Sequence, residues 1–275
     1  MIDKIKTLTR IFVKDFYQRT KLVDKETNKL NKKSIWFWIL VILGITMIYI
    51  SYEVINWLKS NGMPEVFLII YMMFTLFLLT IQAIAASSSV YFFSKDVEFI
   101  LPLPIKNIEL LVSKFNTLLI MIYSTEIVFS VLPFLLYGFM NYTGIKYFLI
   151  ILIILIFIPI IIVSVISLLT IVLMKMFSFI KNRNVIQNII SLLLTVLLGG
   201  VEFVLFGNIE NIKENFVNTY IVKTLYTDSL NIILKNIGLI TAMAIGTFTI
   251  FVCICKKIYL KSVLESISEK KLLKN

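Results

Sequence analysis

The stretch YFLIILIILIFIPIIIVSVISLLTIVLM (residues 147–174) runs without a single charged side chain. A helix needs about 20 apolar residues to cross roughly 30 Å of hydrocarbon, because each residue advances it by about 1.5 Å. The whole chain is 59% hydrophobic with a mean hydropathy of +0.93, whereas soluble domains are about 45–50% apolar. The sequence therefore predicts an all-α, polytopic membrane protein.

Five further apolar runs surround this stretch and complete a predicted bundle of six transmembrane helices over residues 35–255. The predicted spans lie near residues 35–58, 65–93, 115–140, 147–174, 185–206 and 232–255. Trp36 and Trp38 open the first span and are typical of the aromatic belt at a membrane interface. Residues 1–34 form a predicted basic segment before the spans, and residues 256–275 form a basic tail after them.

The distribution of basic residues predicts the orientation of the spans. Of the 27 lysine and arginine residues, 22 lie in residues 1–34, 94–114, 175–183 and 256–275, and five lie in the alternate connections. Basic residues concentrate in cytoplasmic segments of membrane proteins, so both termini and residues 94–114 are predicted to be cytoplasmic. Topology thus explains the net charge of +11, and no nucleic-acid partner is expected.

The N-terminal segment has apolar residues at helical spacing, namely Ile2, Ile5, Leu8, Phe12 and Phe16. Basic residues occupy the rest of the helical wheel. This pattern is typical of an amphipathic helix that lies in the cytoplasmic interface of the bilayer. The alternative is a solvated basic leader that only sets the topology.

Several classes of chemistry lack their usual residues. The chain has no histidine, and its two cysteines, Cys253 and Cys255, lie inside an apolar run. Neither a G-x-x-x-x-G-K-[ST] nor a G-x-G-x-x-G motif is present, and these are the common phosphate-binding loops. The sequence therefore predicts no catalytic residue, metal or cofactor, and a protein that is not itself an enzyme.

Two acidic residues, Glu126 and Glu202, lie inside predicted spans. A charge at the centre of a bilayer costs about 2.5–3.5 kcal/mol on insertion scales, so each carboxyl is expected to face the bundle or a partner. Both are candidate intramembrane polar sites. The alternative is a packing carboxyl that is protonated or hydrogen-bonded to neighbours such as Ser124, Thr125 and Ser130.

The connection SKDVEFILPLPIKNIELLVSK (residues 94–114) carries six charges between two apolar runs. Pro102 and Pro104 break any continuous helix, and the residues around them are apolar. A short rigid element at the membrane surface suits docking, since rigidity lowers the entropy cost of binding. The alternative is a simple surface hairpin, for which this segment is unusually apolar.

The sequence YFFSKDVEFILPLPIK (residues 91–106), followed by Ser113 and Lys114, resembles the signature of bacterial ABC-2 type transporter permeases. With the six-span plan and the basic N-terminal helix, the resemblance covers essentially the whole chain. It implies that the connection is a coupling segment that docks on a separate ABC ATPase, and that two six-span halves pair around one path. The implied contact residues are Lys95, Asp96, Glu98, Phe99, Leu101, Pro102, Leu103 and Pro104.

The sequence as a whole therefore predicts a permease subunit of an ATP-driven exporter in a bacterial plasma membrane. ATP hydrolysis is expected on the separate ATPase, and the second permease half is either the same chain or another. The resemblance implies that the chain is either a natural half-permease or a shortened one. Two alternatives remain open, namely a membrane scaffold or accessory subunit, and a proton-coupled secondary transporter that uses its intramembrane carboxyls.

Overall fold

The computed structural model describes residues 2–19, 32–91, 105–141, 143–176, 188–196, 199 and 217–272. Within these ranges the regular elements are all helical, which confirms the predicted all-α class. The elements are α1 (Ile2–Arg19), α2 (Lys32–Ser60), α3 (Glu65–Tyr91), α5 (Asn107–Glu126), η1 (Ile127–Val131), α6 (Leu132–Met140), α7 (Ile145–Met176), η3 (Val217–Val222), α9 (Lys223–Tyr226) and α10 (Leu230–Leu272). Residues 188–196 are also helical.

Five helical stretches within the described ranges are long and apolar enough to cross a membrane. They are Val41–Ser60, Glu65–Tyr91, Asn107–Met140, Ile145–Met176 and Leu230–Tyr259. The third joins α5, η1 and α6 without a break. Six spans were predicted, but most of the predicted span at 185–206 lies outside the described residues.

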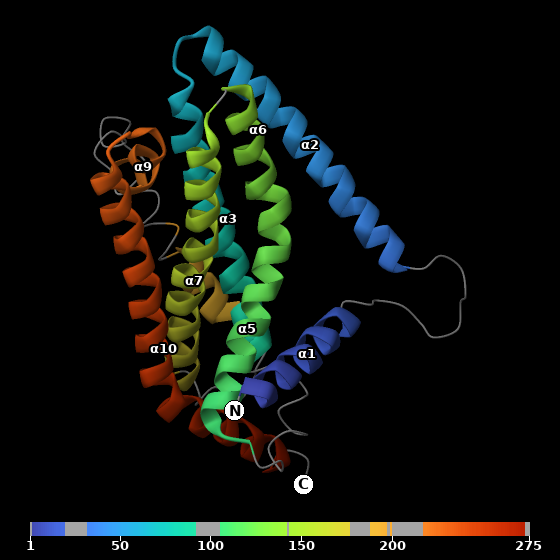
Figure 1. Cartoon of the computed structure of the whole chain (residues 1–275). Helices are drawn as coiled ribbons and strands as arrows, with labels where there is room; N and C mark the ends of the chain where they lie inside the picture. The colour runs from blue at the N-terminus through green and yellow to red at the C-terminus, as the bar shows by residue number, and fades with distance from the viewer. Residues whose placement is uncertain are drawn as a thin grey trace.

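Figure 1 shows α3, α5, α7 and α10 as an upright bundle, with α7 packed against both α3 and α10. Helix α2 contacts α6 and η1 and leans away from the bundle at its other end. Helix α1 crosses the lower end of α5, and the end of α10 lies at the same end of the molecule. The α2–α3 turn, the α6–α7 connection and α9 lie at the opposite end.

Buried hydroxyl groups join the helices of the bundle. The hydroxyls of Ser87 on α3 and Thr170 on α7 are 2.8 Å apart. On α10, Tyr259 donates a hydrogen bond of 2.9 Å to the carbonyl oxygen of Tyr91 on α3. Such bonds are worth about 0.6–2 kcal/mol between membrane helices, so they fix which faces of the helices meet.

The outer surface of the bundle is apolar. On α3 the exposed side chains Ile70, Phe74, Phe77 and Ile81 recur every three or four residues and form one continuous stripe. Soluble monomers rarely expose a large contiguous apolar face to water. The stripe is therefore suited to contact with lipid.

Candidate functional site

Polar side chains lie where the second of the five apolar stretches packs against the third. Gln82 belongs to α3, and Tyr123, Thr125 and Glu126 belong to α5. The Thr125 hydroxyl donates to Gln82 Oε1 at 2.7 Å and joins α5 to α3. Tyr123 lies three residues before Glu126 and is therefore its neighbour on the helix surface. Glu126 is only 3% exposed, and its Oε1 atom has no hydrogen-bond partner among the described residues.

The backbone changes its winding directly after Glu126. Helix α5 ends at this residue, and η1, a π-helical segment, begins at Ile127. Single-turn π segments are uncommon within α-helices and occur frequently at functional sites. The buried carboxyl therefore lies at the point where the third span departs from regular α geometry.

Two tyrosine hydroxyls bind backbone carbonyl groups close to the prolines of the spans. Pro133 has no N–H to offer the carbonyl four residues earlier, which is that of Phe129. Tyr71 on α3 donates to this Phe129 oxygen at 2.6 Å. Near Pro159, Tyr123 donates to the Ile156 oxygen of α7 at 2.6 Å. The Tyr71 bond reaches the carbonyl that Pro133 leaves without its backbone donor. The Tyr123 bond reaches Ile156, one residue after Leu155, whose carbonyl Pro159 leaves without a donor.

Replacing Tyr71 by Phe is expected to lower the stability of the protein, because the Phe129 carbonyl then lacks its donor. An unsatisfied buried polar group costs roughly 1–3 kcal/mol. The measurement is the midpoint of thermal unfolding of the detergent-purified protein. Tyr49→Phe is the control, since the Tyr49 side chain on α2 is 65% exposed. Equal losses in the two variants would contradict the role given to Tyr71.

A buried lysine holds the N-terminal helix against α5. Lys114 is 1% exposed, and its Nζ atom lies 3.9 Å from the ring centroid of Phe12 on α1. Leu8 and Phe12 are buried as well, and the Ser113 hydroxyl is 3.4 Å from the Ile5 carbonyl oxygen. The apolar stripe of α1, which was predicted to face lipid, therefore packs partly on the protein.

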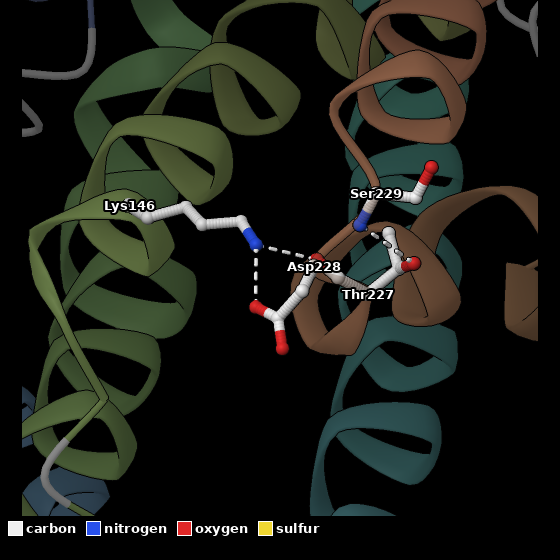
Figure 2. Close-up of polar contacts among 4 residues, drawn as sticks. All are labelled: Lys146, Thr227, Asp228 and Ser229. Atoms are coloured by element: carbon white, nitrogen blue, oxygen red, sulfur yellow. Dashed lines mark hydrogen bonds and ion pairs between the residues drawn. The ribbon is translucent and has the colours of Figure 1, made fainter.

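At the opposite end of the bundle, Lys146 joins α7 to the segment that follows α9. Its Nζ atom lies 3.0 Å from Asp228 Oδ1 and also donates to the Thr227 carbonyl, as Figure 2 shows. The Ser229 N–H lies 3.4 Å from the Thr227 hydroxyl oxygen in the same turn. Because the Asp228 side chain is fully exposed, solvent screens this ion pair and its contribution to stability is small.

A pair of tyrosines lies beside this contact. The hydroxyls of Tyr137 on α6 and Tyr226 on α9 are hydrogen-bonded to each other. Burial raises the pKa of Tyr226, and the neighbouring Tyr137 hydroxyl and Glu65 carboxylate raise it further. Tyr226 therefore stays protonated at neutral pH and remains able to donate or accept this bond.

The structure describes only one of the site residues predicted from the sequence, Glu126. The predicted docking residues between Lys95 and Pro104 lie outside the described residues, as does Glu202. Of the three predicted partners of Glu126, which are Ser124, Thr125 and Ser130, two bond elsewhere. Ser124 donates to the Met121 carbonyl, and Thr125 donates to Gln82 and to the Ile122 carbonyl. Within the described ranges no group of three or more His, Cys, Asp or Glu residues is placed to hold a metal ion.

Sequence reasoning missed Tyr71, Gln82, Tyr123 and the burial of Lys114. A search for tyrosines able to reach the carbonyls beside Pro133 and Pro159 would have selected many candidates, since the chain has 12 tyrosines. Lys114 was placed in a segment expected to lie in water or at the membrane surface. Its burial depends on α1, which comes about one hundred residues earlier in the chain.

A family model described as "Putative ATP-binding cassette" matches residues 28–261, which is most of the chain. The chain belongs to this ATP-binding cassette family. No curated protein and no solved structure gives a match. The family match supports transport in the context of an ABC transporter, and the apolar helices support a place in a membrane.

The family match corrects three predictions made from the sequence. The assignment to ABC-2 type permeases is wrong, because the matching family is described as an ATP-binding cassette and not as a permease. The function of a permease subunit driven by a separate ATPase is wrong for the same reason, and so is the prediction that the chain is not an enzyme. The match also does not favour the two alternatives, the scaffold and the proton-coupled transporter.

The family description implies a bound nucleotide, but the described residues do not fit the usual site for one. The phosphate loop of ATPases joins a strand to the N-terminus of a helix and carries the G-x-x-x-x-G-K-[ST] motif. The described ranges contain no strand, and the motif is absent from the sequence. The described residues therefore supply no phosphate-binding loop of this kind.

Proposed function

We propose that the chain is a membrane-embedded member of the ATP-binding cassette family and works as part of an ABC transporter. The observation that carries the proposal is the joint presence of the family match over residues 28–261 and five apolar helices of spanning length. The α3 stripe of exposed apolar side chains adds support, because it suits a lipid environment better than water. The family match supports a role in an ABC transporter, and the apolar helices support a location in a membrane.

The proposal includes a sixth span near residues 185–206 and a bacterial plasma membrane as the location. The concentration of basic residues in residues 1–34, 94–114, 175–183 and 256–275 supports cytoplasmic termini. On α1, Ile2 and Ile11 are 80% and 50% exposed and lie among basic residues. This exposed face suits the headgroup region of the cytoplasmic leaflet.

We further propose that residues 95–104 form a contact segment for another component of the transporter. The support comes from the sequence, where apolar residues and two prolines stand between charged flanks. Glu126 and Glu202 are proposed as polar sites within the membrane. For Glu126 the support is its burial and its unpartnered Oε1 atom.

Membrane integration is tested by fractionating cells that express the full chain. We expect the chain to stay in the membrane pellet after an alkaline carbonate wash and to leave it only in detergent. Release by carbonate, or recovery of folded chain from the soluble fraction, would overturn the proposal.

The orientation of the third apolar stretch is tested separately. Asn107→Cys and Asn141→Cys are made in a cysteine-free background and labelled in intact cells. Only the second variant should react without permeabilisation.

The nucleotide part of the family description is tested separately on the purified chain. A photo-reactive ATP analogue is added to the detergent-solubilised protein, with and without excess ATP. The family description implies labelling that ATP suppresses. A folded chain that is not labelled would show that this polypeptide does not bind the nucleotide, and would leave its place in the membrane intact.

A further inference from the structure

Glu126 is an acidic side chain buried well inside a membrane-spanning stretch. It lies within Asn107–Met140 and is 3% exposed. The other acidic residues of the described spans, Glu53, Glu65 and Glu109, lie closer to span ends. Ionisable residues inside membrane helices are rare and usually mark a functional site.

The groups nearest to Glu126 in the sequence are already engaged elsewhere. Thr125 donates to Gln82 Oε1 at 2.7 Å, and Tyr123 donates to the Ile156 carbonyl at 2.6 Å. Oε1 of Glu126 has no donor among the residues that the structure describes. A buried acceptor left without a donor costs about 1–3 kcal/mol, so a ligand that supplies one would gain this free energy on binding.

A charged donor is also missing from the same helix at this depth. Lys114 is the nearest basic residue along α5, and the step of twelve residues from Lys114 to Glu126 corresponds to about 18 Å. Its Nζ atom is held at the Phe12 ring. A charged donor for Glu126 must therefore come from outside this helix.

We propose that Glu126 binds the protonated amine of an amphipathic small molecule within the membrane. The inference rests on the proposed function in an ABC transporter and names the substrate class. An ammonium is favoured over a hydroxyl because charge-assisted hydrogen bonds are roughly twice as strong as neutral ones. The start of η1 directly after Glu126 makes this the position where the span departs from α geometry. The body of the proposed ligand is apolar because the span that carries Glu126 is apolar.

Binding is tested with the purified full chain, a dansyl-labelled alkylamine and its N-acetylated analogue, which carries no positive charge. We expect Glu126→Gln to weaken binding of the amine at least tenfold and to leave the weak binding of the acetylated probe unchanged. Glu53→Gln is the matched control, because Glu53 also lies in a span but is exposed. Equal affinity of the amine for the wild-type protein and Glu126→Gln would overturn the proposal.

A second measurement uses the unmodified protein, so that it does not depend on the folding of a variant. A hydrophobic carbodiimide is added to the wild-type chain, and the modification of Glu126 is followed by peptide mass spectrometry. We expect the dansyl-labelled amine to protect Glu126 at least fivefold, while the acetylated probe gives no protection. Modification at an unchanged rate with saturating amine would contradict the site. Loss of membrane integration in the fractionation would instead contradict the proposed function.

Discussion

Replacing Gly138 by Ala is expected to lower the stability of the bundle by about 1–3 kcal/mol, the usual cost of overpacking. Gly138 is a buried residue of α6, and a Cβ atom there would lie 2.8 Å from ring atoms of both Phe148 and Tyr147 on α7. The Tyr147 ring cannot move freely, because its hydroxyl donates to the Phe134 carbonyl at 3.0 Å. The measurement is the midpoint of thermal unfolding of the purified protein in detergent.

Gly246→Ala is the matched control for this prediction. Gly246 lies within α10, and a Cβ atom there would meet nothing within 4 Å. Alanine favours the helix over glycine by about 0.5–1 kcal/mol, so this variant should be as stable as the wild type or slightly more so. An equal loss of stability in both variants would contradict the close approach of α6 and α7 at Gly138.

The five apolar helices of spanning length were predictable because hydropathy and length alone specify such helices. Residues 147–174 give the clearest case, and the structure has helix α7 at Ile145–Met176. The bonds between helices were not predictable in the same way. The bond from Tyr71 to the Phe129 carbonyl depends on the rotation and register of α3 against η1, and uniformly apolar helices carry little information about either.

The candidate site could be predicted only as a residue type in an unusual place. An acid inside an apolar run singled out Glu126. Its lack of a hydrogen-bond donor could not be predicted, because it depends on the contacts that neighbouring hydroxyls such as that of Thr125 make in the fold.

The functional assignment failed for a different reason. It rested on a short motif at residues 91–106 and on a six-span plan that many membrane proteins share, whereas the family match extends over residues 28–261.

Replacing Phe12 by Ala is expected to release α1 from α5. The Phe12 side chain is 3% exposed, and truncating a buried Phe costs about 3–5 kcal/mol. The change also removes the ring beneath the Lys114 ammonium, a contact worth about 2 kcal/mol when it is desolvated. Limited trypsin digestion in detergent measures the release, because Lys6 and Arg10 lie on the exposed side of α1. Cleavage of α1 should become at least tenfold faster.

Two variants separate the contributions to this contact. Ile11→Ala changes a side chain of α1 that is 50% exposed, and it should leave the rate of digestion near that of the wild type. Phe12→Leu keeps much of the apolar volume but removes the aromatic face, so its digestion rate should lie between those of Ile11→Ala and Phe12→Ala. If Phe12→Leu matches the wild type, packing alone holds α1 and the ring contact with Lys114 contributes nothing. If Phe12→Ala itself digests at the wild-type rate, α1 is not held on α5 by this side chain.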